Sequence, residues 1–190
     1  MTLFADVVSA SAAVAATSSR SAKVATLAGL LRALEPGEVP ICVGFLSGAP
    51  RQGRVGIGYA AIRGLESAGP AEPSLTVADV DRAISDVEAE TGSGSSGRRR
   101  ELLAGLFSRA TEPEATFLVG LLTGGLRQGA LAGLMADAVA KAAGVRGEIA
   151  RRALMLSGDL TEMARIAITD GEAGLRAVGF ELFRPILPML

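Results

Sequence analysis

The chain has 190 residues, 49% of them hydrophobic, which is enough for one sizeable core or for two small packed halves. Its formal net charge is −1, so the composition excludes a protein that attracts nucleic acid through a large overall positive charge. The absence of histidine excludes Ser-His-Asp and Cys-His nucleophiles and histidine-ligated zinc, and the single cysteine excludes an intramolecular disulfide.

The first half of the chain predicts helices. Thr17-Ser18-Ser19 and Thr76 offer caps for helix N-termini, because their hydroxyl oxygens can accept hydrogen bonds from free backbone amides. A short apolar segment from Val39 to Leu46 contains the single cysteine, Cys42, which we expect to pack in the core. Apolar spacing and these caps place the predicted helices over residues 3–16, 24–34, 57–65 and 77–90.

The second half has the same helical character. The tail from Val178 onward carries Pro185 and Pro188, which cannot continue a helix, so we expect an extended segment that leaves the folded part. The predicted helices cover residues 98–110, 112–122, 131–142, 149–156 and 159–168. Together with the first half, this pattern predicts an all-α fold of roughly ten helices.

One loop motif occurs twice, at an offset of 76 residues. Residues 45–53 have the sequence FLSGAPRQG, and residues 121–129 have the sequence LLTGGLRQG. Each copy has two apolar residues, a hydroxyl, a glycine and a final Arg-Gln-Gly. The repeat predicts two pseudo-symmetric halves, about 1–90 and 98–180, separated by a glycine- and serine-rich loop at 91–97.

Two interpretations of the duplicated loop are open. In the functional one, the glycines let the backbone approach a ligand, Arg51 and Arg127 add positive charge, and a helix N-terminus behind each loop faces a phosphate. Two such loops would contact both strands of a duplex across a minor groove without reading its sequence. In the structural one, Gly48 and Gly124 are helix C-caps and the arginines are solvated.

Other basic and glycine-rich segments also have two interpretations each. Arg98–Arg100 lies at a predicted helix start, where it forms either a solvated face or a contact to DNA. Ser18-Ser19-Arg20 with Lys23 is either an ordinary cap with solvated charges or a phosphate contact. The run Gly56-Ile57-Gly58 fits a loose dinucleotide fingerprint with Asp79 downstream, but it lacks the strand that the fingerprint requires directly before it.

These residues resemble the N-terminal DNA-binding domain of ATP-dependent DNA ligases, most closely in its actinobacterial style, over essentially the whole chain. The second loop copy is the most specific landmark. In chain order, the matching landmarks are Thr17-Ser18-Ser19-Arg20-x-x-Lys23, Leu46-Ser47-Gly48 leading to Gly56-Ile57-Gly58, the second loop at 122–129, and Gly158-Asp159-Leu160 before the tail at 183–190.

The resemblance implies an all-helical domain whose two halves grip the minor groove of duplex DNA around a nick. Gly124, Arg127 and Gly129 match positions at which the family contacts the DNA backbone. Arg51 and Gln52 would do the same by internal symmetry. The full set of candidate DNA-binding residues is Ser19, Arg20, Gly48, Arg51, Gln52, Gly53, Gly124, Gly125, Arg127, Gln128 and Gly129.

The sequence departs from the family pattern in two places. Pro50 stands where the second loop has Leu126, so the two loops are expected to differ in geometry. The Lys-x-Asp-Gly motif that attacks ATP is incomplete, because Ile168 occupies the lysine position before Asp170-Gly171. We therefore expect no catalytic residue, metal ligand or cofactor in this chain. Residues 181–190 are expected to link it to a nucleotidyltransferase domain that would use ATP and Mg²⁺.

The expected partners are nicked double-stranded DNA and the catalytic domains of the same protein, with no membrane. The single cysteine and the lack of a signal segment favour a reducing compartment, and the resemblance implies the bacterial cytoplasm, with an activity at the nucleoid. Two other hypotheses stay open. A helical protein-interaction module would use the loops as caps and would not bind DNA. A small-molecule enzyme built on residues 56–58 would be stabilised by ATP or NAD.

Overall fold

In the computed structural model, the described residues are 1–53, 56–65, 69–126, 131–182 and 186. Their regular structure is helical apart from one isolated bridge between Leu3 and Thr76. These described residues form eleven α-helices, α1 to α11, and one 3-10 helix. The all-α class predicted from the sequence is confirmed.

The helices follow one another through short connections. Up to the second loop copy they are α1 (Phe4–Ala16), α2 (Arg20–Ala33), the 3-10 helix (Pro36–Glu38), α3 (Val39–Ser47), α4 (Tyr59–Ile62), α5 (Val77–Ala89), α6 (Ser95–Arg109) and α7 (Glu112–Thr123). After it come α8 (Leu131–Ala143), α9 (Gly147–Ser157), α10 (Leu160–Thr169) and α11 (Gly171–Ala177).

The chain folds into two compact units. Unit 1 comprises Met1–Val8 with Phe45–Arg127, and unit 2 comprises Ser9–Gly44 with Gln128–Leu190. Both copies of the duplicated loop, as far as Leu126, belong to unit 1. The two halves predicted from the sequence, about 1–90 and 98–180, rest on an internal repeat. The two units are defined by contacts and do not test that repeat, so the halves stay a prediction.

Aromatic packing holds the core of unit 1 together. The fully buried ring of Phe4 lies 5.9 Å from that of Phe45 and 5.6 Å from that of Phe117, between ring centroids, in edge-to-face geometry. The backbone amide of Phe4 donates to the carbonyl oxygen of Leu75 at 2.8 Å, which fixes the ring in place. Because Phe45 opens the first loop copy and Phe117 lies one turn before the second, one buried ring supports both loops.

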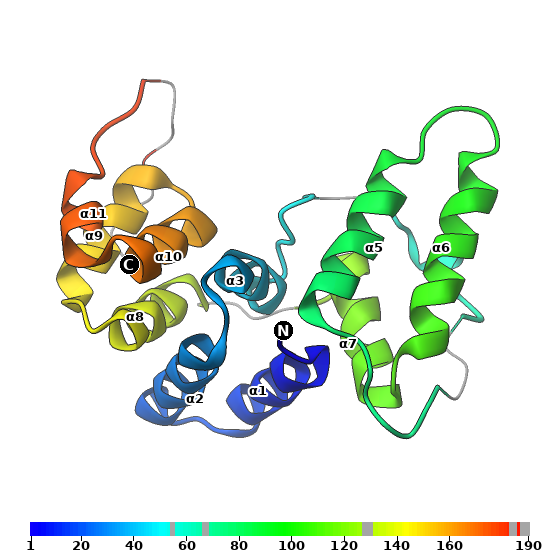
Figure 1. Cartoon of the computed structure of the whole chain (residues 1–190), viewed down its shortest axis with the longest axis horizontal. Coiled ribbons are helices and arrows are strands. Elements are labelled where there is room, and N and C mark those ends of the chain that lie inside the picture. The colour runs from blue at the N-terminus through cyan, green and yellow to red at the C-terminus, as the bar shows by residue number, and fades with distance from the viewer. Residues whose placement is uncertain (54–55, 66–68, 127–130, 183–185, 187–190) are drawn as a thin grey trace. The chain divides into compact units, whose positions relative to one another are not determined.

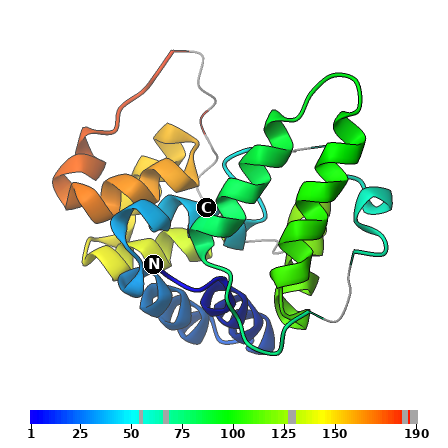
Figure 2. The same ribbon diagram turned by 45° about the vertical axis from the view of Figure 1, so that its right-hand side comes forward.

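Helices α5 and α6 lie side by side in unit 1 (Figure 1), and the turned view in Figure 2 shows them as an antiparallel pair. A capping box begins α5: Thr76 Oγ1 accepts from the amide of Asp79, and the Asp79 carboxylate accepts from the amide of Thr76, both at 3.1 Å. Val80, Ile84 and Val87 form the buried face of α5 that their spacing predicts.

The basic triplet near the start of α6 is engaged within unit 1. Arg98 donates to the carboxylate of Glu90 and to two carbonyl oxygens of the loop between α5 and α6. Arg99 donates to the carbonyl oxygen of Glu90, and Arg100 donates to two carbonyl oxygens at the end of α4. Positive charge at helix C-termini is favourable. The triplet therefore fastens α6 to its neighbours, instead of forming a simply solvated face.

Helix α8 is the centre of unit 2, where it contacts α2, α9 and α10 (Figure 1). Met135, Ala138 and Val139 are fully buried on α8, as the apolar stripe of the sequence predicts. Leu27 and Leu31 of α2 are buried as well. The helix predicted over 24–34 is thus confirmed, and it begins earlier, at Arg20.

Cys42 of α3 is fully buried, as expected. Burial, and to a smaller extent the negative charge of Glu38, raises the pKa of its thiol to about 12. Because the thiolate is the reactive form, we expect an aromatic disulfide reagent to leave the folded protein unmodified at about pH 8 and to label it once urea unfolds it. Absorbance of the released thiol measures this reaction, and stoichiometric labelling without urea would contradict the packing.

The sequence does not predict the structure of one segment, and another differs from its prediction. The apolar segment from Val39 is a helix, α3, which lacks a polar face because it is buried nearly all round. Of the helix expected over 57–65, only Tyr59–Ile62 is helical. Residues 178–182 continue beyond α11 without regular structure, in agreement with the expected exit segment, while 183–185 and 187–190 lie outside the described residues.

Candidate functional site

The two copies of the duplicated loop lie against each other in unit 1. Gly48 directly follows α3, and a Cβ atom placed on it would lie 3.2 Å from the carbonyl oxygen of Leu126. Gly48 has a φ of +70° and Gly124 a φ of +71°, a backbone region that favours glycine. The two glycine-containing loops are therefore neighbours in unit 1, and their binding to DNA stays a prediction.

The second loop closes the end of α7. The amides of Gly125 and Leu126 both donate to the carbonyl oxygen of Gly120, at 2.8 and 3.1 Å, and Gly124 is the C-cap in the left-handed region. The interpretation of this glycine as a C-cap is therefore confirmed. Arg127, Gln128 and Gly129 lie outside the described residues, and α8 begins at Leu131, shortly after them.

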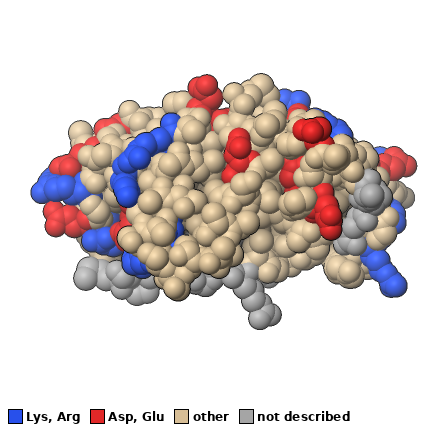
Figure 3. All heavy atoms as spheres, turned by 90° about the horizontal axis from the view of Figure 1, so that it is seen from below, with Lys and Arg blue, Asp and Glu red and all other residues tan. Residues whose placement is uncertain are grey.

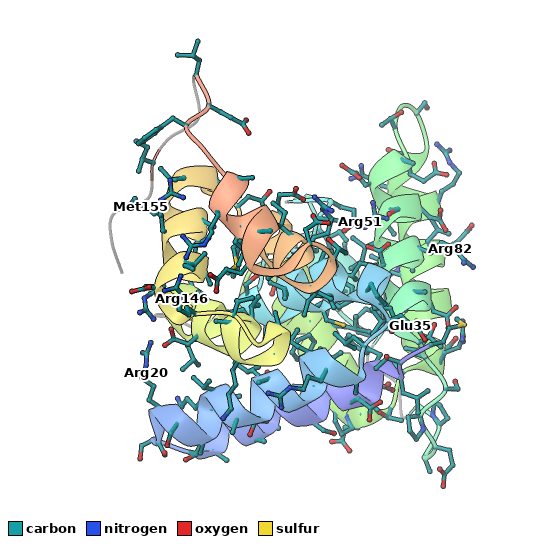
Figure 4. The ribbon with its side chains drawn as sticks, turned by 60° about the vertical axis from the view of Figure 1, so that its left-hand side comes forward. Arg20, Glu35, Arg51, Arg82, Arg146 and Met155 are labelled. Carbon is teal, nitrogen blue, oxygen red and sulfur yellow. The ribbon has the colours of Figure 1, made fainter. Side chains whose placement is uncertain are left out.

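Arg51 of the first loop is bound to a carboxylate of α5. Its Nε and Nη2 donate to Asp81 Oδ1 and Oδ2, both at 2.6 Å, and Nη2 also donates to Ser85 Oγ at 3.2 Å. The hydrogen bond and charge of Asp81 raise the pKa of the Arg51 guanidinium. The side chain of Arg51, labelled in Figure 4, is 56% exposed, whereas the side chain of Asp81 is 10% exposed. Arg51 is therefore exposed to solvent, as the structural interpretation has it, and is also bound to Asp81, which that interpretation does not include.

Gln52 binds the same place on α5. Its Nε2 donates to Asp81 Oδ1 at 2.8 Å, to the Asp81 carbonyl oxygen at 3.1 Å and to Ser85 Oγ at 2.8 Å. The loop then turns at Gly53, whose amide donates to the carbonyl oxygen of Pro50 at 2.7 Å. No sequence pattern points to Asp81 or Ser85, yet together they bind two of the three residues of the first Arg-Gln-Gly motif.

The helix that was expected directly behind the first loop is not found there. The next helix, α4, begins at Tyr59 and has four residues. A single helical turn carries little dipole, so the first loop does not offer a phosphate the N-terminus of a long helix. Pro50, which is buried, accepts a hydrogen bond within the turn. The difference in geometry expected from Pro50 stays a prediction, because residues of the second loop lie outside the described part.

Ser19 and Arg20 belong to unit 2. Ser19 caps α2 by accepting from the amide of Ala22 at 3.3 Å. Arg20 extends from the first turn of α2 (Figure 4) and donates to Asp137 of α8 at 2.7 Å, with a side chain 64% exposed. Asp137 also accepts from Arg151 of α9, so one carboxylate lies between two guanidinium groups.

The dinucleotide fingerprint finds no support in the structure. Within the described residues, no strand precedes Gly56-Ile57-Gly58. Asp79, its proposed acidic partner, is instead part of the capping box of α5, where hydrogen bonds from Thr76 and from Arg109 lower the pKa of its carboxyl group. These contacts give Asp79 a structural role.

The incomplete adenylation motif is likewise structural. Asp170 is both the C-cap of α10 and the N-cap of α11, and Gly171 has a φ of +62° at the junction. Ile168, at the lysine position, lies half-buried in α10. Since a hydrocarbon replaces the nucleophilic amine at a helix junction, these residues do not fit an adenylate-accepting site.

Charge is distributed without a single basic stripe on the face seen in Figure 3, where blue and red side chains lie among one another in the described part. Across the described ranges, no cluster of three or more cysteine and acidic side chains could hold a metal ion. None of the helices between residues 1 and 182, in the parts that are described, is long and apolar enough to cross a membrane.

Comparison with known proteins gives a consistent set of matches. The family described as DNA ligase N terminus matches residues 60–140. A probable DNA ligase of Mycolicibacterium gilvum (strain PYR-GCK) is 51% identical over 188 residues, which are 99% of this chain and 37% of the relative. One of Saccharopolyspora erythraea is 52% identical over the whole chain and 37% of the relative, and one of Nocardia farcinica (strain IFM 10152) is 52% identical over 99% of the chain and 36% of the relative. The chain thus spans little more than a third of the length of these relatives.

Proposed function

The chain belongs to the DNA ligase N-terminal family, and from this premise we propose that it binds nicked duplex DNA without sequence preference and presents the nick to a ligase core. The observation that carries the proposal is the contact between the two glycine-containing loops in unit 1. Backbone amides and arginines on neighbouring loops suit two phosphates of one minor groove. Contacts of this kind position a duplex but do not read bases.

The charge balance bears on the strength of this binding. With a net charge of −1, the chain has no global attraction to DNA, so binding rests on a few local phosphate contacts. We expect a dissociation constant in the range of about 1–100 μM near physiological salt, as is typical of non-specific binding. A ligase core that closes around the same duplex would add the remaining affinity through effective concentration.

The proposal extends to the longer protein. We propose that the parent is an ATP-dependent DNA ligase of the bacterial cytoplasm that acts in repair, replication or recombination, with ATP and Mg²⁺ used by its catalytic domains. The junction at Asp170 does not fit these groups, so no step of that reaction is assigned to the residues of this chain. Its own contribution is to hold and orient DNA.

Arg127→Ala is the variant that tests the second loop. We expect weaker binding to nicked duplexes of any sequence, and a salt slope lower by about one, because one phosphate contact is lost. Fluorescence anisotropy over a series of salt concentrations measures both quantities. Arg165→Ala, in α10, is the matched control because it removes the same charge from an arginine that pairs with Glu162. Equal effects of the two substitutions, or an unchanged slope in Arg127→Ala, would count against the assignment.

A further inference from the structure

The first loop is bound to α5 through the carboxylate of Asp81. An unpaired negative charge would be unfavourable in a surface that binds DNA. Asp81 is 7% exposed and accepts from both Arg51 and Gln52 of the loop. Its carboxylate receives the side-on edge of the guanidinium, the geometry that fixes an arginine most firmly. We infer that Asp81 is a positioning residue for DNA binding, which holds Arg51 and the first loop in the arrangement that meets a phosphate. The inference rests on the proposed function.

The hydrogen bonds leave part of the guanidinium available. Arg51 uses Nε and Nη2 toward Asp81 and Ser85, so Nη1 lies away from the carboxylate. The side chain is 56% exposed in spite of the bidentate contact. A guanidinium carries five N–H donors, and a phosphate can therefore bind Arg51 while Asp81 still holds it.

Anchoring also orders the rest of the loop. Gln52 donates to Asp81 and to Ser85, which fixes the backbone between Pro50 and Gly53. Ordering these residues before DNA arrives lowers the entropy cost of binding. A loose Arg51 would have more freedom to lose on meeting a phosphate, and its loop would no longer be held beside the second one.

The substitution Asp81→Asn separates positioning from net charge, because the two predict opposite signs. Removing a negative charge from a protein that binds DNA should strengthen binding if charge alone matters. We expect Asp81→Asn to weaken binding of the 190-residue chain to a nicked duplex about tenfold and to lower the salt slope by about one. Asp86→Asn is the matched control, since Asp86 is exposed on the same helix and the charge change is equal; binding should stay the same or tighten slightly.

Circular dichroism melting accompanies the anisotropy titrations, so that loss of folding is seen directly. If Asp81→Asn does not fold, Ser85→Ala replaces it, because it removes only a hydroxyl that accepts from Arg51 and Gln52. For this milder variant we expect about threefold weaker binding.

The outcomes separate the two claims. Wild-type binding combined with a folded Asp81→Asn that binds as tightly as Asp86→Asn, or more tightly, would overturn the positioning role and leave the proposed function standing. Tighter binding would mean that Asp81 competes with DNA for Arg51. No binding of the wild-type chain even at low salt would overturn both the proposed function and the inference built on it.

Discussion

Phe4→Ala is expected to cost about 3–5 kcal/mol of unfolding free energy, a large part of the stability of a protein of this size. The ring is 0% exposed, and it contacts Phe45 and Phe117 edge to face. Truncation leaves a cavity between the segments that carry the two loops, and the surrounding backbone cannot collapse freely because Phe4 is hydrogen-bonded to Leu75. Urea unfolding followed by circular dichroism gives the free energy.

The control for this experiment is Phe180→Ala. Phe180 is 76% exposed beyond α11, so the same truncation should change stability by less than about 0.5 kcal/mol. If Phe4→Ala were as stable as Phe180→Ala, the ring could not be the support that holds the start of the first loop against α7. Phe4→Leu, which restores much of the volume, should recover part of the loss.

Gly69→Ala should destabilise unit 1 by about 1–3 kcal/mol or more, although only one methyl group is added. A Cβ atom on Gly69 would overlap the carbonyl oxygen of Ala110 and lie 2.9 Å from its carbonyl carbon. This backbone cannot easily move, because Ala110 is the C-cap of α6 and Thr111 begins α7 with its own capping box to Glu114. The midpoint of thermal unfolding should therefore fall.

The same chemical change at Gly97 provides the opposite expectation. Gly97 lies in the first turns of α6 with open space around its Cα, so alanine should stabilise the helix by up to about 1 kcal/mol. Melting curves of Gly69→Ala and Gly97→Ala, each compared with the wild-type chain, test both expectations. A fall for Gly97→Ala as large as that for Gly69→Ala would show that general intolerance of alanine, and not the contact with Ala110, is responsible.

Local patterns predict most of this fold. The helices over 77–89, 131–143 and 147–157 follow from apolar stripes, and the first also from the capping residue Thr76. These signals act within a few residues of each other. Apolar spacing does not predict helix α3, because this helix is buried nearly all round and its sequence has no amphipathic period. The C-cap at Gly124 is one of the two interpretations that the sequence leaves open, and its positive φ is a local requirement.

Less of the candidate site than of the fold can be predicted from the sequence. The partner of Arg51 lies 30 residues away on α5, and nothing in the spacing of Arg51 and Asp81 distinguishes this pair from other oppositely charged residues. Asp79, two positions earlier, was the residue that a motif selected, yet it caps the helix. Which carboxylate meets which arginine depends on how the loop packs on α5, and that is decided by tertiary contacts.

The most direct measurement is the binding of the 190-residue chain to a fluorescent nicked duplex, titrated at several salt concentrations beside Arg51→Ala/Arg127→Ala. We expect binding that is independent of sequence, weakens steeply as salt rises and is lost in the double variant. Absence of binding to any nicked duplex at low salt, with the chain folded, would contradict it.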